Sequence, residues 1–197
     1  MAVRYGFPVP LSALRTVFAW LALLLPSAAM PNPAHAVSPT WVLIDTTHEV
    51  ARVMRGDNEV DEFRNISIGR GGVSRVHIEG DDTTPLGRYH ITRVDRDSRF
   101  HVFLGLDYPT IRQLDEANRR GIVSTNRYGH LLDYVLAHGR LPQDSILGGH
   151  IGLHGLGEAD PAIHARLNWT GGCVAFTDRQ IDRLLTYVHV GTTVVIR

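Results

Sequence analysis

The sequence contains no lysine, so all 20 of its basic residues are arginine. Without a lysine amine, the protein cannot form a Schiff base with a carbonyl substrate or use lysine as a general base. An excess of positive charge is also missing, because 20 acidic residues balance the 20 arginines. Proteins that bind nucleic acid usually carry a strongly basic face, so this balance argues against a nucleic-acid partner.

Acidic residues are absent from the first 36 residues, which hold Arg4, Arg15 and an apolar run over residues 17–25, and which end in small residues. This order is typical of a secretory signal peptide. The run of about nine apolar residues is shorter than the ~20 that a membrane-spanning helix needs. We therefore predict a signal peptide over residues 1–36 and an exported protein of the periplasm or cell envelope, with no stable membrane span after cleavage. An uncleaved anchor over residues 11–30 is the alternative.

Cysteine is nearly absent, and Cys173 is the single example. No internal disulfide can form. In an oxidising compartment a lone thiol adds nothing structural and risks oxidation. A solitary cysteine in an exported chain is therefore a candidate reactive thiol. A buried cysteine that behaves as a small apolar side chain is the alternative.

Long helical patterns are also scarce after the leader, and 197 residues favour one domain, over residues 37–197. Short β-branched segments separated by turn residues predict strands at 41–45, 50–54, 60–68, 88–94 and 192–196. Short helices are predicted at 110–120 and 129–138. A third helix follows the capping box of residues 177–180, where apolar residues recur at helical spacing. The predicted fold class is therefore mainly β, or α+β, with a β-sandwich-like core and a few short helices packed on it.

Two histidines share one predicted strand in the segment 148–155. Strand alternation sends Ile151 and Leu153 to one face, and His150, Gly152 and His154 to the other. Because the apolar face belongs in the core, the histidines are expected to face a cleft or solvent.

The single cysteine follows two glycines in the segment 168–176. Alternation places Val174 and Phe176 in the core and Cys173 on the opposite face. The paired glycines allow backbone conformations that other residues avoid. Backbone amides left unpaired there can donate to a developing oxyanion.

A cysteine and a histidine together suggest nucleophilic catalysis. A free thiol has a pKa near ~8.5 and is mostly protonated at neutral pH. An adjacent imidazole can take its proton and later return it to a leaving group. The other imidazole nitrogen needs a partner. Because no acidic residue lies near His154 and Cys173 in the two strands, the carbonyl of Gly155 is the nearest candidate.

At this point the sequence resembles the YkuD-type L,D-transpeptidase catalytic domains of bacterial cell-wall enzymes. That family has His-Gly followed by [Ser/Thr]-x-Gly-Cys, and here His154 and Gly155 precede Thr-Gly-Gly-Cys at 170–173. Residues 80–89 are similar to the family segment Gly-Asp-x-x-Thr-Pro-x-Gly-x-Tyr. The resemblance covers residues 41–197.

The resemblance implies a YkuD-like β-sandwich and an enzyme that acts on peptidoglycan stem peptides without a cofactor or metal. Cys173 would attack the stem tetrapeptide after its third residue, usually meso-diaminopimelate, release D-Ala and form a thioester. Transfer to an amine acceptor would make the enzyme a transpeptidase (a cysteine acyltransferase). Transfer to water would make it an L,D-carboxypeptidase, or a hydrolase of a wall–lipoprotein bond.

Residue roles also follow from the resemblance. His154 would be the general base and acid, the Gly155 carbonyl would orient it, and the amides of Gly172 and Cys173 would form the oxyanion hole. The candidates for substrate contacts are Thr170, Gly171, His150 and Arg88. Many family members have His at the position of Gly171, and Arg or Asn at the position of Ala175. These departures leave the choice of acceptor open.

Three other functions compete with this one. A zinc site could draw on His150, His154, His164 and Cys173, but a strand would hold His150 and His154 ~13 Å apart, too far for one ion. His164 lies in a charged loop and is expected to be solvated. A papain-like amidase has its cysteine before its histidine, and here only His189 follows Cys173. A non-catalytic peptidoglycan-binding domain would tolerate Cys173→Ala. The sequence predicts no oligomeric state.

Overall fold

A curved eight-stranded sheet forms the body of the protein, in a computed structural model that describes residues 38–197. The strand order is β3-β2-β1-β10-β6-β7-β8-β9. The signal peptide predicted over residues 1–36 lies outside the described residues. The strands are β1 (Thr40–Asp45), β2 (Val50–Arg55), β3 (Asn58–Arg64), β6 (Gly87–Ser98), β7 (His101–Leu106), β8 (Gly152–His154), β9 (Val174–Ala175) and β10 (Thr193–Ile196). A separate ribbon pairs β4 (Val73–Ser74) with β5 (Thr84–Pro85).

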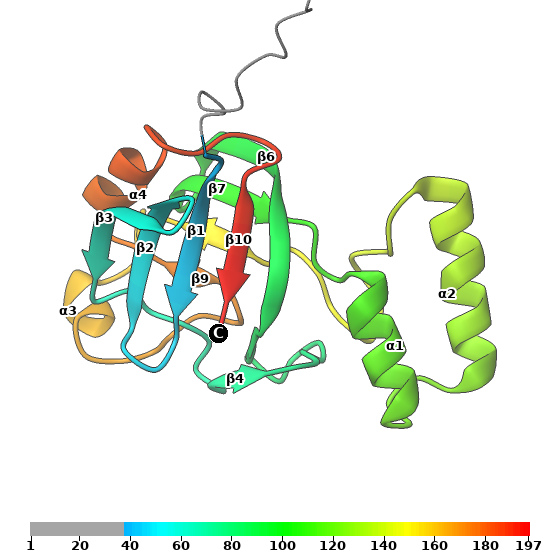
Figure 1. Ribbon diagram of the computed structural model, residues 1–197. Coiled ribbons are helices and arrows are strands. Elements are labelled where there is room, and N and C mark those ends of the chain that lie inside the picture. The colour runs from blue at the N-terminus through cyan, green and yellow to red at the C-terminus, as the bar shows by residue number, and fades with distance from the viewer. Residues whose placement is uncertain (1–37) are drawn as a thin grey trace, which may run out of the picture. The chain divides into compact units, whose positions relative to one another are not determined.

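The long strand β6 joins the two halves of this sheet. On one side it pairs antiparallel with β10, and on the other with β7. Within each half one pair is parallel, β1 with β10 and β8 with β9. An isolated bridge between Ser67 and Ala175 links the chain after β3 back to β9. Figure 1 shows the curved sheet that results.

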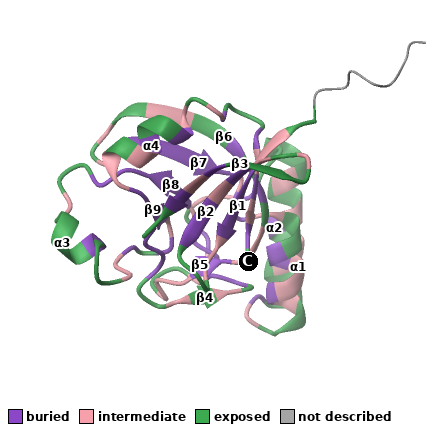
Figure 2. Ribbon diagram, turned by 60° about the vertical axis from the view of Figure 1, so that its left-hand side comes forward, coloured by how far each residue is buried: buried purple, intermediate pink, exposed green. Residues whose placement is uncertain are grey.

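One apolar core fills the space enclosed by this sheet. Alternate residues of both halves enter it, among them Ile44, Ile91 and Leu104, and each is almost fully buried. Helix α4 (Asp178–Leu184) contributes Ile181 and Leu184 to the same core. Figure 2 shows the buried strands at the centre and exposed helix surfaces around them. The mainly β fold class with short helices is therefore confirmed.

Two helices stand to one side of the sheet (Figure 1). Helix α1 (Ile111–Arg119) and helix α2 (Thr125–His138) enclose an apolar cluster of their own with the loop that follows them. The predicted start of α2 at residue 129 is wrong by four residues. Ser124 caps the helix, since its hydroxyl accepts a hydrogen bond from the Arg127 amide at 3.3 Å.

The capping box correctly predicted the start of one helix, whereas one strand is shorter than its sequence pattern predicts. The capping box is present, because Thr177 Oγ1 accepts from the Gln180 amide while the Gln180 side chain accepts from the Thr177 amide. The strand predicted over 60–68 ends early, at Arg64, because Asn65 adopts a positive φ of 57°. Within residues 38–197, no helix is long and apolar enough to cross a membrane.

Candidate active site

Cys173 and His154 open into one cavity on the side of the sheet away from the core. In the sheet, His154 on β8 lies beside Ala175 on β9, and Leu153 lies beside Val174. Cys173 directly precedes Val174, so it continues this register beside Gly152. The nucleophile candidate and the base candidate therefore stand on adjacent strands, displaced by two positions and facing the same way. Both line a cavity of about 500 Å³.

The imidazole of His154 is held in one orientation by its neighbour. Its Nδ1 lies 2.7 Å from the carbonyl oxygen of Gly155. A carbonyl can only accept, so Nδ1 carries the proton and Nε2 of the neutral ring is left as an acceptor. His154 is only 2 % exposed. Burial lowers its pKa to about 4, against the opposing effect of the Gly155 hydrogen bond, and the nearby charges of His164 and Arg99 lower it further.

Aromatic side chains surround this imidazole. The Phe100 ring centroid lies 4.2 Å from that of His154, and Phe103 stacks nearly parallel at 6.3 Å. Trp169 meets the imidazole edge-on at 5.9 Å. These apolar walls exclude water from the imidazole, which is the physical cause of its lowered pKa.

Glycine is required at position 155 because the chain passes close to two other segments there. A Cβ on Gly155 would come within 2.6 Å of Asp178 Oδ1 and 2.8 Å of the Phe100 carbonyl oxygen. Asp178, the first residue of α4, accepts hydrogen bonds from the amides of Leu156 and Gly157 at 2.7 and 3.0 Å. The start of α4 thus fixes the turn that presents the Gly155 carbonyl to His154.

The thiol of Cys173 is half-buried and protonated at neutral pH. Its Sγ donates a weak hydrogen bond to the carbonyl oxygen of His150 at 3.5 Å. Burial raises the pKa of Cys173 to about 11, and the backbone amide of Gly152 opposes this rise. The pKa of His154 is low and that of Cys173 is high, so both groups are neutral at pH 7.

Thr170 holds the loop that carries the cysteine. Its hydroxyl donates to the Cys173 carbonyl oxygen at 2.6 Å and accepts from the Gly172 amide at 3.2 Å. Thr170 is 3 % exposed, and its own amide donates to Ile68. Its hydroxyl is therefore engaged inside the loop, while the residue also lines the cavity of Cys173.

The same loop contains the two amides that were expected to form the oxyanion hole. The Gly172 amide donates to the Thr170 hydroxyl at 3.2 Å. The Cys173 amide has no acceptor among residues 38–197. Gly172 has a φ of 125°, and a Cβ there would meet the Thr83 carbonyl oxygen at 2.8 Å. Gly171 is exposed and lines the cavity beside Cys173.

His150 lies at the cavity, although not on a strand. Strand β8 begins at Gly152, and His150 has a positive φ of 55°, so the expected alternation does not extend to it. Its amide donates to Gln143 Oε1 at 2.9 Å and its carbonyl accepts from the thiol. The loop after α2 is thereby linked to the nucleophile candidate.

Arg88 does not line the cavity of Cys173; another arginine of the same strand, Arg93, does. Arg88 is exposed near the start of β6, opposite Val195 of β10. The two parts of β6 face differently because the strand pairing shifts between Ile91 and Arg93. No local pattern in residues 88–94 indicates this shift.

Three residues of the site escaped sequence reasoning. Phe100 lies far from His154 in the sequence, His164 and Trp169 belong to the segment between His154 and Cys173, and only the fold brings them together. The expectation that His164 is solvated is wrong, because it is 6 % exposed and its Nδ1 accepts a hydrogen bond from Trp169 Nε1 at 3.3 Å. Burial lowers the pKa of His164 as well. Within residues 38–197, no group of three or more histidine, cysteine or acidic residues is arranged to hold a metal ion.

Comparison with known protein families identifies the family of this chain, and comparison with solved structures supports the fold. A model of the YkuD family, described as L,D-transpeptidase catalytic domain, matches residues 39–196. Among solved structures, Bd1075 of Bdellovibrio bacteriovorus superposes with a TM-score of 0.53 at 18 % identity, over 82 % of this chain and 49 % of that one. The helical cell-shape-determining protein Pgp2 of Campylobacter jejuni gives 0.53 at 21 % identity, over 81 % and 47 %. This chain therefore spans about half the length of these structures. No curated protein sequence matches it.

Proposed function

Because the chain belongs to the YkuD family of L,D-transpeptidase catalytic domains, we propose that it is a peptidoglycan L,D-transpeptidase with Cys173 as nucleophile. The observation that carries this proposal is the geometry of one pair of side chains. His154 lies on β8, and Cys173 directly precedes the adjacent strand β9. Both side chains open into the same cavity, and the imidazole keeps Nε2 available because Nδ1 is bound to the Gly155 carbonyl.

The first half-reaction is an acyl transfer to sulfur. His154 Nε2 takes the thiol proton as Cys173 Sγ attacks the carbonyl carbon between the third residue of the stem and D-Ala. The backbone amide of Cys173 donates to the developing oxyanion. The imidazolium then returns the proton to the nitrogen of D-Ala, the C–N bond breaks, and a thioester on Cys173 remains.

The second half-reaction transfers the acyl group to an amine. His154 takes a proton from the acceptor amine as its nitrogen attacks the thioester carbon. The C–S bond breaks and the sulfur takes the proton back from the imidazolium. If water is the acceptor, the same steps release a tripeptide and the enzyme is an L,D-carboxypeptidase. The chain and its two substrates supply every proton and electron pair, so this scheme uses no cofactor.

The neutral resting pair suits this chemistry. A thiol with a raised pKa is a poor spontaneous nucleophile and resists oxidation outside the cytoplasm. A neutral imidazole is the form that can accept a proton. Activation therefore coincides with attack on a bound substrate, when the proton moves directly from Sγ to Nε2.

A product assay tests the proposal. The purified protein is incubated with a disaccharide-tetrapeptide, and the products are separated by liquid chromatography and identified by mass spectrometry. Cross-linked dimers support the transpeptidase, and tripeptide alone corrects the acceptor to water. Cys173→Ala abolishes either product, while Arg96→Gln, an exposed change on β6 away from the cavity, leaves product formation unchanged. Absence of product from the unaltered protein refutes the enzyme and favours a peptidoglycan-binding domain.

The place of action follows from the proposed substrate. Peptidoglycan lies outside the cytoplasmic membrane, so we propose that residues 1–36 direct export and are then removed. N-terminal sequencing of the protein recovered from the cell envelope tests this proposal. A mature chain that begins near residue 37 agrees with it, and an intact Met1 in envelope fractions contradicts cleavage.

A further inference from the structure

A second cavity adjoins the one that holds Cys173. It has a volume of about 480 Å³ and lies between strands β6 and β7 and the loop that follows α2. Four residues line both cavities: Arg93, Phe103, His150 and Ile151. The two cavities therefore share a wall, and a ligand bound at Cys173 can extend into the second cavity.

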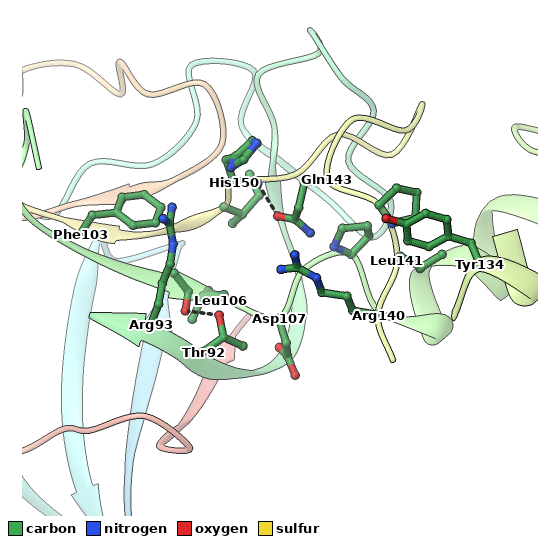
Figure 3. A pocket seen from close by; sticks show the side chains of 14 residues that line it. Thr92, Arg93, Phe103, Leu106, Asp107, Tyr134, Arg140, Leu141, Gln143 and His150 are labelled. Carbon is green, nitrogen blue, oxygen red and sulfur yellow. Dashed lines mark hydrogen bonds between the residues drawn. The ribbon is translucent and has the colours of Figure 1, made fainter. Parts of the chain in front are cut away.

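Two arginines supply the charge of this second cavity. Figure 3 shows Arg93 reaching in from β6, and Arg140 reaching in from the opposite wall, beside Gln143. Neither arginine forms an ion pair within residues 38–197. The one carboxylate in the lining, Asp107, accepts hydrogen bonds from the His90 amide at 2.8 Å and from His90 Nδ1 at 3.0 Å.

An irregularity in β6 aims Arg93 at the active site. Ile91 pairs with Leu106 and Arg93 pairs with the adjacent Gly105, so two steps along β6 match one step along β7. This is the pattern of a β-bulge, which reverses the alternation of the strand beyond it. Ile91 consequently enters the core, whereas Arg93 emerges on the face that carries the cavities.

The next strands leave room for this side chain. Gly105 on β7 pairs with Gly152 on β8, and Gly152 adjoins Cys173. A Cβ on Gly105 would lie 2.8 Å from Arg93 Cγ and 2.9 Å from Nε, so the arginine crosses directly over this glycine. Its guanidinium carbon sits 4.9 Å from the Phe103 ring centroid. The row Arg93, Gly105, Gly152, Cys173 thus runs across four strands on one face.

The spacing of this row sets the kind of group that Arg93 meets. Neighbouring strands lie ~4.8 Å apart, so the Cα atoms of Arg93 and Cys173 are separated by about 14 Å. The Arg93 side chain extends over Gly105 of β7, which brings its guanidinium one strand spacing closer to Cys173. About 10 Å then remains between the guanidinium and the Cys173 sulfur. That distance matches two to three residues of extended peptide, at ~3.5 Å each.

We infer that Arg93 and Arg140 form a subsite for a carboxylate of the peptide whose scissile carbonyl is at Cys173. Guanidinium groups bind carboxylates through two parallel hydrogen bonds, and a ligand carboxylate would supply the ion-pair partner that Arg93 and Arg140 do not have within residues 38–197. The subsite rests on the proposed function, because it assigns a stem peptide to the two cavities. The carboxylate at the D-centre of diaminopimelate sits at the end of a long side chain and can span this distance. The C-terminal carboxylate lies only one residue past the scissile bond, about 3.5 Å along the chain, and is too near.

Binding to an inactive protein tests the subsite without turnover. Calorimetry with Cys173→Ala measures Kd for the tetrapeptide and for two forms of it, one amidated at the D-centre of diaminopimelate and one at the C-terminus. In this background Arg93→Gln and Arg140→Gln each weaken binding of the tetrapeptide about tenfold, or about 1.4 kcal/mol. Arg96→Gln, on the same strand but outside both cavities, changes Kd less than twofold.

The amidated ligands identify the carboxylate. For the amidated tetrapeptide that lacks the carboxylate bound by the two arginines, Arg93→Gln and Arg140→Gln should not raise Kd further. If each variant weakens all three ligands equally, or if Arg96→Gln acts as strongly as they do, the subsite is refuted. Because Cys173→Ala needs no catalysis, this result stands apart from the product assay: tight, arginine-dependent binding without product refutes the enzyme and keeps the subsite.

A charge-conserving variant gives an independent check. Gly105→Ala keeps both arginines but displaces Arg93 through its new Cβ. It should weaken the tetrapeptide as Arg93→Gln does, with an unfolding temperature close to that of the parent. Unchanged binding in a folded Gly105→Ala variant contradicts the placement of Arg93 in the subsite.

Discussion

Alkylation of Cys173 as a function of pH probes the resting state of the catalytic pair. The Cys173 pKa of about 11 lies at least two units above that of an unperturbed thiol, so at pH 7 the thiolate population is at least about a hundredfold lower. The pKa of His154 is lowered to about 4, so proton transfer from the thiol to the imidazole is also unfavourable in the free protein. The neutral thiol and neutral imidazole are therefore the dominant resting forms at pH 7.

Iodoacetamide reacts with thiolates, so its rate reports this population. The rate with the native protein should rise about tenfold per pH unit from pH 6 to 10, and unfolded protein should react about a hundredfold faster at pH 7. His154→Gln should leave this profile nearly unchanged while abolishing turnover. A rate plateau between pH 5 and 8 that disappears in His154→Gln would show a preformed ion pair and refute the reasoning.

Three further predictions concern the groups that hold the pair. Gly155→Ala forces its Cβ against Asp178 and displaces the carbonyl that orients His154. Steady-state kinetics should show kcat lowered at least about tenfold with KM little changed. An unaltered kcat would contradict the role of this turn. Thr170→Val removes the hydroxyl that bonds the Cys173 carbonyl, and it should lower the free energy of unfolding in urea by about 1 kcal/mol and also lower kcat. Thr170→Ser keeps the hydroxyl and should retain both. Equal losses in the two variants would assign the effect to packing instead of the hydroxyl. The pKa of His154 falls from 6.5 in the unfolded chain to about 4 in the folded protein. Between these pH values the unfolded chain binds a proton that the folded protein does not. The free energy of unfolding therefore declines as the pH falls from about 6.5 to 4. The decline attributable to this group is about 3 kcal/mol; His154→Gln should flatten it, and an unchanged pH dependence refutes the assignment.

Alternation and capping rules were enough to predict much of the fold. Cys173 and Val174 face opposite ways, as their pattern predicts, because Val174 lies in a core that admits only apolar side chains. The third helix begins at its capping box because that signal is local. The resemblance to the family, found from two short motifs, is confirmed by the match over residues 39–196.

The remaining features depend on contacts between distant segments. The aromatic walls of His154 come from two distant parts of the chain, so no periodicity reveals them. Thr170 was interpreted from its motif alone, but its hydroxyl is fixed by a loop geometry that the glycines permit. A bulge in β6 reverses the alternation before Arg93 and turns this side chain toward the cavities. The bulge arises from the pairing with β7, so the sequence of β6 alone does not reveal it.

Mass spectrometry of the protein itself tests the central claim most directly. The protein is mixed briefly with a tetrapeptide stem in the absence of an amine acceptor, quenched in acid, digested and mapped. The account predicts an acyl adduct with the mass of the tripeptide on the peptide that contains Cys173, matched by free D-Ala and removed by hydroxylamine. Release of D-Ala with no adduct at Cys173, or from the Cys173→Ala variant, would contradict it.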